Sequence, residues 1–169
     1  MPRFVAFLRG INMGGNKLVP MAQLRTLFEE LGYEDVKTLL QSGNVVFTAS
    51  SSPTLETKLE KAFTQEFDFS SEFFVRSSFE LSKAIKSNPF TAEAIEDPSH
   101  LLVMFLKEPA SAASFSAFLK THAGPELVNS NGSELYIYYP EGIGRSKLKI
   151  PFNGTARNWN TLIKLQEIL

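Results

Sequence analysis

Four short polar segments hold the residues of this sequence that could recognise an anion. Arginine can clamp a phosphate or carboxylate through two parallel hydrogen bonds, and lysine adds positive charge. Asparagine amides and the backbone N–H groups of glycine-rich loops donate further hydrogen bonds to such groups. We therefore expect a site for a small phosphorylated or carboxylated ligand, formed by residues of RGINMGGNK, QSGN, RSK and TARNWN: Arg9, Asn12, Gly14, Gly15, Asn44, Arg145, Ser146, Lys147, Thr155, Arg157, Asn158 and Asn160.

The distribution of charge agrees with a local anion site. The chain has 169 residues and a formal net charge of −1, yet residues 1–28 and residues 142–160 contain basic side chains and no acidic ones. Two locally basic segments in a neutral protein fit a focused anion site better than the extended basic face of a general nucleic-acid binder.

The sequence does not identify catalytic residues, a metal or a cofactor. Ser42, Ser146 and Thr155 are candidate nucleophiles, but no histidine that could act as a base lies near any of them in sequence. The chain lacks cysteine, and its two histidines are too far apart in sequence to form a recognisable ligand pair. The spacings typical of nucleotide-binding loops are also absent. We therefore predict no metal site, except for Mg²⁺ carried in by a phosphate ligand.

The first half of the chain predicts a βαββαβ unit over residues 1–77. Residues 3–9 form an apolar run typical of a buried strand, and residues 18–32 have helical periodicity ending at Gly32. Two β-type runs then meet at Ser42-Gly43, which predicts a hairpin with Gly43 at positive φ. A helix over 51–67 and a strand over 72–77 complete the ferredoxin-like order.

The second half predicts a related but less regular unit over residues 100–169. A connecting helix begins at a Ser77–Glu80 capping box, and a polar, proline-containing linker follows within residues 78–99. Residues 100–108 then indicate a strand, 111–123 a helix, and 126–140 a hairpin that turns at Asn131-Gly132. With a C-terminal helix this gives βαββα, so we expect an α+β protein of two ferredoxin-like subdomains, the second irregular or incomplete.

The C-terminal helix is expected to begin at Thr155, the candidate N-cap behind Gly154. A helical wheel places Trp159 on the apolar face, so we predict that Trp159 packs in the core. If residues 145–150 are extended, Arg145, Lys147 and Lys149 share one side of a strand. The helix N-terminus and these cations would then form half of an anion pocket that the 9–17 loop completes.

Structural explanations stay open for each segment. The three cations can belong to a solvated edge strand, and Asn158 can satisfy helix N–H groups. The 9–17 loop and the QSGN segment can be ordinary turns. We further expect these two loops at opposite ends of a ferredoxin-like sheet. In that case either the two subdomains bring unlike ends together, or some of the motifs hold the fold together instead.

The four segments together resemble the bacterial domain-of-unknown-function family 1697. The resemblance covers essentially the whole chain and implies the α+β fold of that family with two ferredoxin-like parts. It implies no activity, substrate or cofactor. The positions typical of the family are Arg9, Gly10, Asn12, Gly14, Gly15, Gln41, Ser42, Gly43, Asn44, Arg145, Ser146, Lys147, Thr155, Arg157, Asn158, Trp159 and Asn160.

Two other functions compete with small-ligand binding. Binding of RNA or single-stranded nucleic acid would suit ferredoxin-like sheets with aromatic residues, but no RNP-like string occurs and the pI is near 6.2. A structural or protein-interaction role is the third. The sequence has no signal segment, no apolar run long enough to cross a membrane and no lipidation motif. We therefore expect a cytoplasmic protein with no membrane partner.

Overall fold

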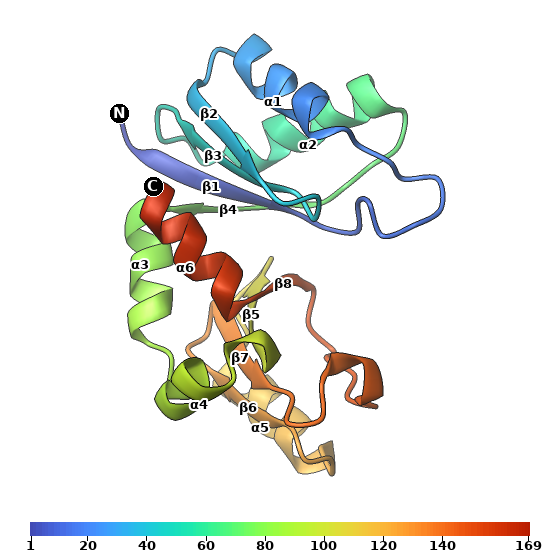
Figure 1. Ribbon diagram of the computed structural model, residues 1–169, viewed down its shortest axis with the longest axis vertical. Helices are drawn as coiled ribbons and strands as arrows, with labels where there is room; N and C mark the ends of the chain where they lie inside the picture. The colour runs from blue at the N-terminus through green and yellow to red at the C-terminus, as the bar shows by residue number, and fades with distance from the viewer. The chain divides into compact units, whose positions relative to one another are not determined.

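The computed structural model describes residues 1–169, and the chain divides into two compact units. The first comprises Met1–Ser82 together with Leu165–Leu169, and the second comprises Lys83–Lys164. Each unit contains one four-stranded antiparallel sheet. With six α-helices in the chain, the protein has a mixed α and β architecture (Figure 1).

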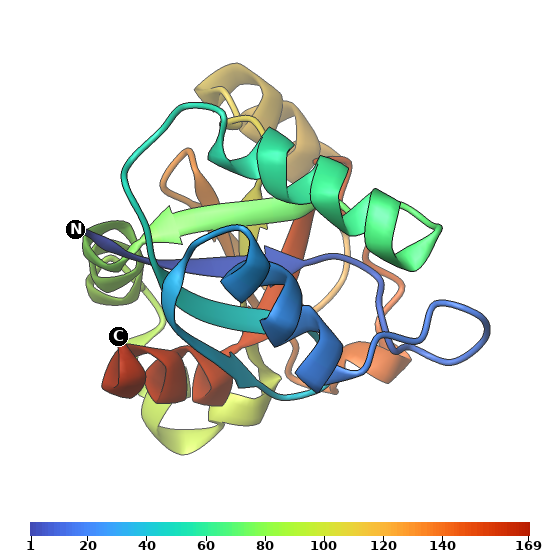
Figure 2. The same ribbon diagram turned by 90° about the horizontal axis from the view of Figure 1, so that it is seen from above.

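The first unit contains the predicted βαββαβ order. Its sheet has the strand order β2-β3-β1-β4, and all neighbouring strands are antiparallel. Helices α1 and α2 both lie on one face of this sheet (Figure 2). The elements are β1 (Arg3–Leu8), α1 (Met21–Glu30), β2 (Glu34–Leu39), β3 (Asn44–Thr48), α2 (Leu55–Phe67), β4 (Phe73–Ser77) and the first residues of α3 (Ser78–Lys86).

The apolar run of β1 explains why this strand is central. Phe4, Ala6 and Leu8 belong to the core beneath the two helices, and Val5 and Phe7 on the opposite face are fully buried as well. A strand buried on both faces has a continuous apolar sequence rather than an alternating one. Aromatic rings fill the core, and the ring centroids of Phe28 and Phe47 lie 5.1 Å apart in an edge-on arrangement.

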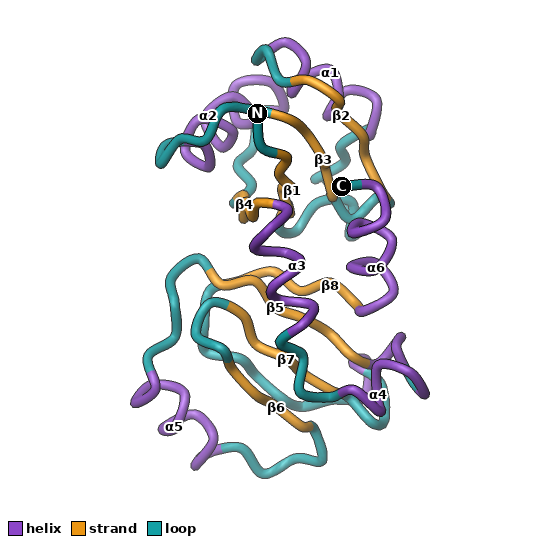
Figure 3. Tube along the Cα trace, turned by 90° about the vertical axis from the view of Figure 1, so that its left-hand side faces the viewer, coloured by secondary structure: helices purple, strands orange, loops and turns teal.

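The sheet of the second unit has the strand order β6-β7-β5-β8, which repeats the relative order of the first sheet. Helix α5 lies beside β6 and β7, and most of the chain between β7 and β8 is loop (Figure 3). After the end of α3, the elements are α4 (Thr91–Glu96), η1 (Pro98–His100), β5 (Leu101–Leu106), α5 (Ala112–Thr121), β6 (Leu127–Ser130), β7 (Glu134–Tyr138), η2 (Ile143–Arg145), β8 (Gly154–Asn158) and α6 (Trp159–Ile168).

The prediction that the last helix begins at Thr155 is wrong. Residues 154–158 form strand β8, which pairs antiparallel with β5 from Leu106↔Gly154 to Leu102↔Asn158. Pairing with a distant strand overrides the local helical pattern, and Gly154 permits it because a Cβ there would lie 2.5 Å from the carbonyl oxygen of Phe105. Trp159 is therefore the first residue of α6 and only half-buried, not a core residue.

Two other local predictions also need correction. Residues 145–150 are not a strand: Arg145 ends the short η2 helix, and residues 146–150 follow it as loop. Ser146 Oγ accepts a hydrogen bond from the backbone N–H of Leu148 at 3.1 Å, a local turn that competes with strand pairing. The polar segment that was predicted as a linker contains α4 and η1.

Candidate functional site

The two polar loops of the first unit lie at the same end of its sheet, so the prediction of opposite ends is wrong. Strands β1 and β2 are both antiparallel to β3, which lies between them, and therefore run in the same direction. The loop after β1 and the β2–β3 turn therefore lie at the same end of the sheet (Figure 1).

Asn12 joins these two loops through its side-chain amide. Its Nδ2 donates hydrogen bonds to the carbonyl oxygens of Val19 at 2.9 Å and Gln41 at 2.8 Å. Its Oδ1 accepts from the backbone N–H of Val19 at 2.7 Å, and its own N–H donates to Lys17 at 2.9 Å. The amide that was predicted to bind a ligand therefore closes the loop in this structure.

Asn44 has a similar role inside the hairpin. It is fully buried, and its Nδ2 donates to the carbonyl oxygen of Leu39 at 2.8 Å and to Ser42 Oγ at 3.1 Å. Gly43 has φ of +88°, as predicted, and its carbonyl oxygen accepts from the N–H of Leu8 at 3.0 Å. The QSGN segment is thus a turn bound to the end of β1.

The charged and glycine residues of the 9–17 loop are more accessible. Arg9 Nη1 lies 3.5 Å from Glu72 Oε1 in an exposed ion pair, which offsets part of its charge. Gly14 and Gly15 are exposed at φ of +90° and +79°, and a Cβ at either would meet no atom within 4 Å. Glycine suits these two positions because of their positive φ, and not because neighbouring atoms pack closely against them.

In the second unit, Thr155 and Arg157 are buried residues of β8. Arg157 Nη1 donates to Thr155 Oγ1 at 2.7 Å and to the carbonyl oxygen of Ala156 at 2.9 Å. Burial lowers the pKa of Arg157 to about 10, so the guanidinium stays charged at neutral pH. An anion approaching from solvent does not meet this side chain at the surface, contrary to the sequence prediction.

Asn158 is the N-cap of α6. Its Oδ1 accepts hydrogen bonds from the backbone N–H of Thr161 at 3.0 Å and from Thr161 Oγ1 at 3.1 Å. The N–H of the third helical residue is one that no carbonyl within the helix can satisfy, and an asparagine side chain is among the favoured acceptors. The structural interpretation of Asn158 is therefore the one that the contacts support.

Replacing Asn158 with alanine should lower the free energy of unfolding by about 1 kcal/mol because the cap is lost. Asn160→Ala provides the control, since Asn160 is exposed in the first turn of the same helix. Its effect should stay within about 0.5 kcal/mol. Urea denaturation measures both values, and equal losses would show that the Asn158 cap does not stabilise the helix.

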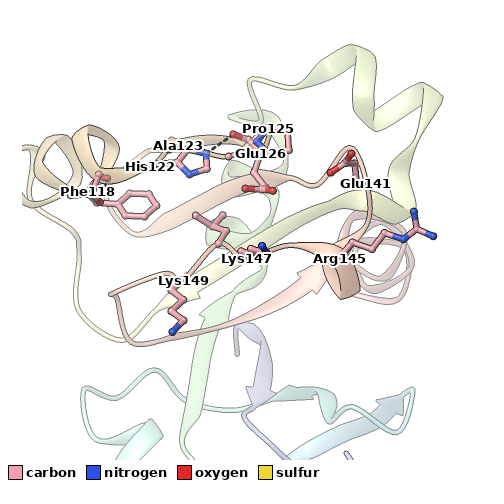
Figure 4. A pocket seen from close by; sticks show the side chains of 12 residues that line it. Phe118, His122, Ala123, Pro125, Glu126, Glu141, Arg145, Lys147 and Lys149 are labelled. Atoms are coloured by element: carbon pink, nitrogen blue, oxygen red, sulfur yellow. Dashed lines mark hydrogen bonds between the residues drawn. The ribbon is translucent and has the colours of Figure 1, made fainter.

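Arg145 and Lys147 line a pocket of about 590 Å³ in the second unit (Figure 4). Lys149 joins them from the same loop, while the end of α5 and the chain that leads to β6 form the other wall. Three of the lining residues, His122, Glu126 and Glu141, are not among the site residues that the sequence predicts. The lining residues are Phe118, Thr121, His122, Ala123, Gly124, Pro125, Glu126, Glu141, Arg145, Lys147, Leu148 and Lys149.

Polar and apolar residues alternate along residues 147–150 of this loop. Leu148 and Ile150 pack against the core of the second unit, whereas Lys147 and Lys149 are exposed. The sequence pattern predicts this alternation for a strand, and the segment keeps it as a loop. The apolar side chains therefore fix this segment to the unit, and Leu148 also lines the pocket, while the two lysines at the same wall remain exposed to solvent.

At the opposite wall, a hydrogen bond and a ring contact fix the side chain of His122. His122 Nε2 lies 2.8 Å from the backbone oxygen of Glu126, so this nitrogen carries the proton and donates it. The His122 ring stacks on Phe118 with an angle of 14° between the planes. Burial, and secondarily the charge of Glu126, raises the pKa of the nearby Tyr139.

The predicted site residues of the second unit do not all meet in this pocket. Thr155, Arg157, Asn158 and Asn160 are absent from its walls, and Ser146 forms the turn described above. A role of Arg9, Gly14 and Gly15 in ligand binding stays a prediction. The structure contains no group of three or more side chains suited to hold a metal ion, and none of its helices combines the length and apolarity that crossing a membrane requires.

A family model described as "Protein of unknown function (DUF1697)" matches residues 1–136, more than half of the chain. The chain belongs to this family. The resemblance to family 1697 is thereby confirmed over residues 1–136, which include two of the four polar segments, RGINMGGNK and QSGN. Among the curated proteins, no sequence matches the chain.

The chain is also similar to the solved structure of the conserved bacterial protein SP0830 from Streptococcus pneumoniae. The two are 26% identical with a TM-score of 0.80, and the match covers 99% of this chain and 98% of the other. The family 1697 match includes the Phe118–Glu126 wall of the pocket and ends before the loop that carries Arg145. Neither description mentions a ligand or a reaction.

Proposed function

We propose that the protein binds a small anionic ligand, phosphorylated or carboxylated, in the pocket of its second unit. The observation that supports this function is that Arg145, Lys147 and Lys149, all from one acid-free segment, line a single pocket. Three cations on one short loop repel one another, and an anion between them removes that repulsion. No carboxylate lies within 4.0 Å of any of the three to form an ion pair.

The size and walls of the pocket suit a metabolite rather than a polymer. Ligand pockets commonly have volumes of about 300–1,000 Å³ and combine apolar walls with a few convergent polar groups. Phe118, Pro125 and Leu148 supply apolar surface here, and the three cations supply the polar groups. Binding would therefore combine charge-assisted hydrogen bonds with burial of the body of the ligand.

Thermal unfolding in the presence of inorganic phosphate, sugar phosphates, nucleotides and short RNA tests this function. A ligand at a hundredfold excess over its dissociation constant should stabilise the native protein by about 2.7 kcal/mol. Arg145→Ala and Lys147→Ala should each remove most of that stabilisation with little change in the unliganded protein, because both side chains are exposed.

Lys120→Ala is the matched control. Lys120 is an exposed cation on α5 that does not line the pocket, so its removal should leave the stabilisation intact. Absence of stabilisation by every compound, or equal losses in the control, would contradict the proposal. Stabilisation by RNA alone would instead favour nucleic-acid binding. Arg9→Ala in the same screen tests whether the 9–17 loop takes part in ligand binding.

We also propose that both units are ferredoxin-like, with the second one irregular. The strand order of the two sheets supports this assignment, as does the helix that follows the first strand of each sheet. The first unit has helix α2 between its third and fourth strands, whereas the second unit has the loop with η2 there. This loop, which makes the second unit irregular, also forms one wall of the candidate pocket. The division into residues 1–77, 78–99 and 100–169 and a cytoplasmic location stay predictions.

A further inference from the structure

We propose that the ligand of this pocket carries a protonated amino group in addition to its anionic group, and that Glu126 binds the amine. This inference rests on the proposed anion site and specifies the chemical class of its ligand. Aminoalkyl phosphates and amino acids are the small molecules that combine the two charges within a few bonds.

Glu126 is the unusual residue of the pocket. Only 8% of the residue is exposed, yet its side chain lines the pocket. Its carboxylate takes part in no hydrogen bond and in no ion pair within 4.0 Å, although three cations line the same pocket. The residue is largely buried, while its carboxylate oxygens remain accessible, and a carboxylate with so little exposure is normally paired in folded proteins.

The surrounding chain fixes the backbone of Glu126, from which the carboxylate reaches the pocket. The backbone oxygen of Glu126 accepts the hydrogen bond from His122, which anchors the start of the segment that leads into β6. Glu126 Oε1 lies directly against Gly124, where any Cβ would collide with it. Gly124 does not have a positive φ, so a side chain at this position would be opposed by the contact with the Glu126 carboxylate and not by the backbone conformation.

The charges in the pocket are separated in a way that suits such a ligand. Figure 4 shows the Glu126 carboxylate pointing into the pocket from one wall, while the segment with Arg145, Lys147 and Lys149 forms the other wall, with Lys147 the cation nearest Glu126 and the ends of Arg145 and Lys149 turned outward. An ammonium group beside Glu126 would supply the missing partner of the carboxylate. A phosphate or carboxylate on the same molecule would then face the wall with Lys147, within reach of the flexible side chains of Arg145 and Lys149.

Isothermal titration of the full chain with three compounds of similar size tests the inference. Phosphoethanolamine carries both charges, its N-acetyl derivative lacks the ammonium, and ethyl phosphate lacks the amine altogether. Phosphoethanolamine should bind about tenfold more tightly than the other two, and in Glu126→Gln all three should bind alike. Glu108→Gln is the control, because Glu108 is an exposed acid that does not line the pocket.

The two proposals fail in different ways. If none of the three phosphates binds, the anion site itself is wrong. If all three bind equally to the unmodified protein, or if Glu126→Gln keeps the preference for phosphoethanolamine, the anion site stands and the role of Glu126 is overturned. The comparison with the N-acetyl compound uses the unmodified protein, so it gives a result even if Glu126→Gln does not fold.

Discussion

Replacing Gly43 with alanine is expected to lower the free energy of unfolding by about 2–5 kcal/mol. Gly43 has φ of +88°, and the left-handed conformation costs other residues about 1–2 kcal/mol. A Cβ there would also lie 2.8 Å from Ile11 Cδ1 and 3.0 Å from Leu8 Cβ, and overpacking of this kind costs about 1–3 kcal/mol. Urea denaturation followed by circular dichroism measures the sum.

Gly132→Ala separates the two contributions. Gly132 turns the β6–β7 hairpin at φ of +100°, but a Cβ at this position meets no atom within 4 Å. Its replacement should therefore cost only the conformational part, about 1–2 kcal/mol. Equal losses at Gly43 and Gly132 would show that the contact of the hairpin with Leu8 and Ile11 relaxes at no cost.

This pair of glycines illustrates what local sequence signals predict. Both hairpin turns and the positive φ of Gly43 followed from the sequence, because turn chemistry depends on neighbouring residues. The contact between Gly43 and Ile11 did not follow, because it depends on which end of the sheet each loop occupies. The strand order of the antiparallel sheet makes β1 and β2 run in the same direction, so both strands finish at the same end of the sheet.

The misassigned start of the last helix has a related cause. Residues 154–158 lie directly before helix α6, and their polar side chains are typical of the first turn of a helix. Their conformation is decided by pairing with β5, a strand about fifty residues earlier in the chain. The pairing also turns Thr155 and Arg157 into the protein, so residues that suggested an exposed anion site are buried.

The candidate pocket shows the same limit for function. Arg145 and Lys147 were identified because several cations without acids are visible in one short segment. Glu126 and His122 belong to a different segment, and nothing in their sequence surroundings distinguishes them from surface residues. Only the fold brings Glu126 to the pocket with its carboxylate unpaired. The cations of this site are therefore predictable from sequence, and the opposing carboxylate is not.

Asn12→Ala is expected to lower the free energy of unfolding by about 3 kcal/mol, because three side-chain hydrogen bonds each contribute about 1 kcal/mol. Asn12 also has φ of 53°, a conformation that asparagine tolerates better than alanine. Asn16→Ala in the same loop is the control, since Asn16 is exposed, and it should change stability by less than about 0.5 kcal/mol.

Phosphate titration of Asn12→Ala then decides between the structural and the ligand-binding roles of Asn12. The amide is already engaged with Val19 and Gln41, so the dissociation constant for phosphate, measured well below the unfolding temperature, should match that of the unmodified protein. A variant with unchanged stability and weakened phosphate binding would restore Asn12 as a ligand residue. With lower stability and unchanged binding, the RGINMGGNK loop and the QSGN turn are an asparagine-linked scaffold, and the anion site depends on the cations of the second unit.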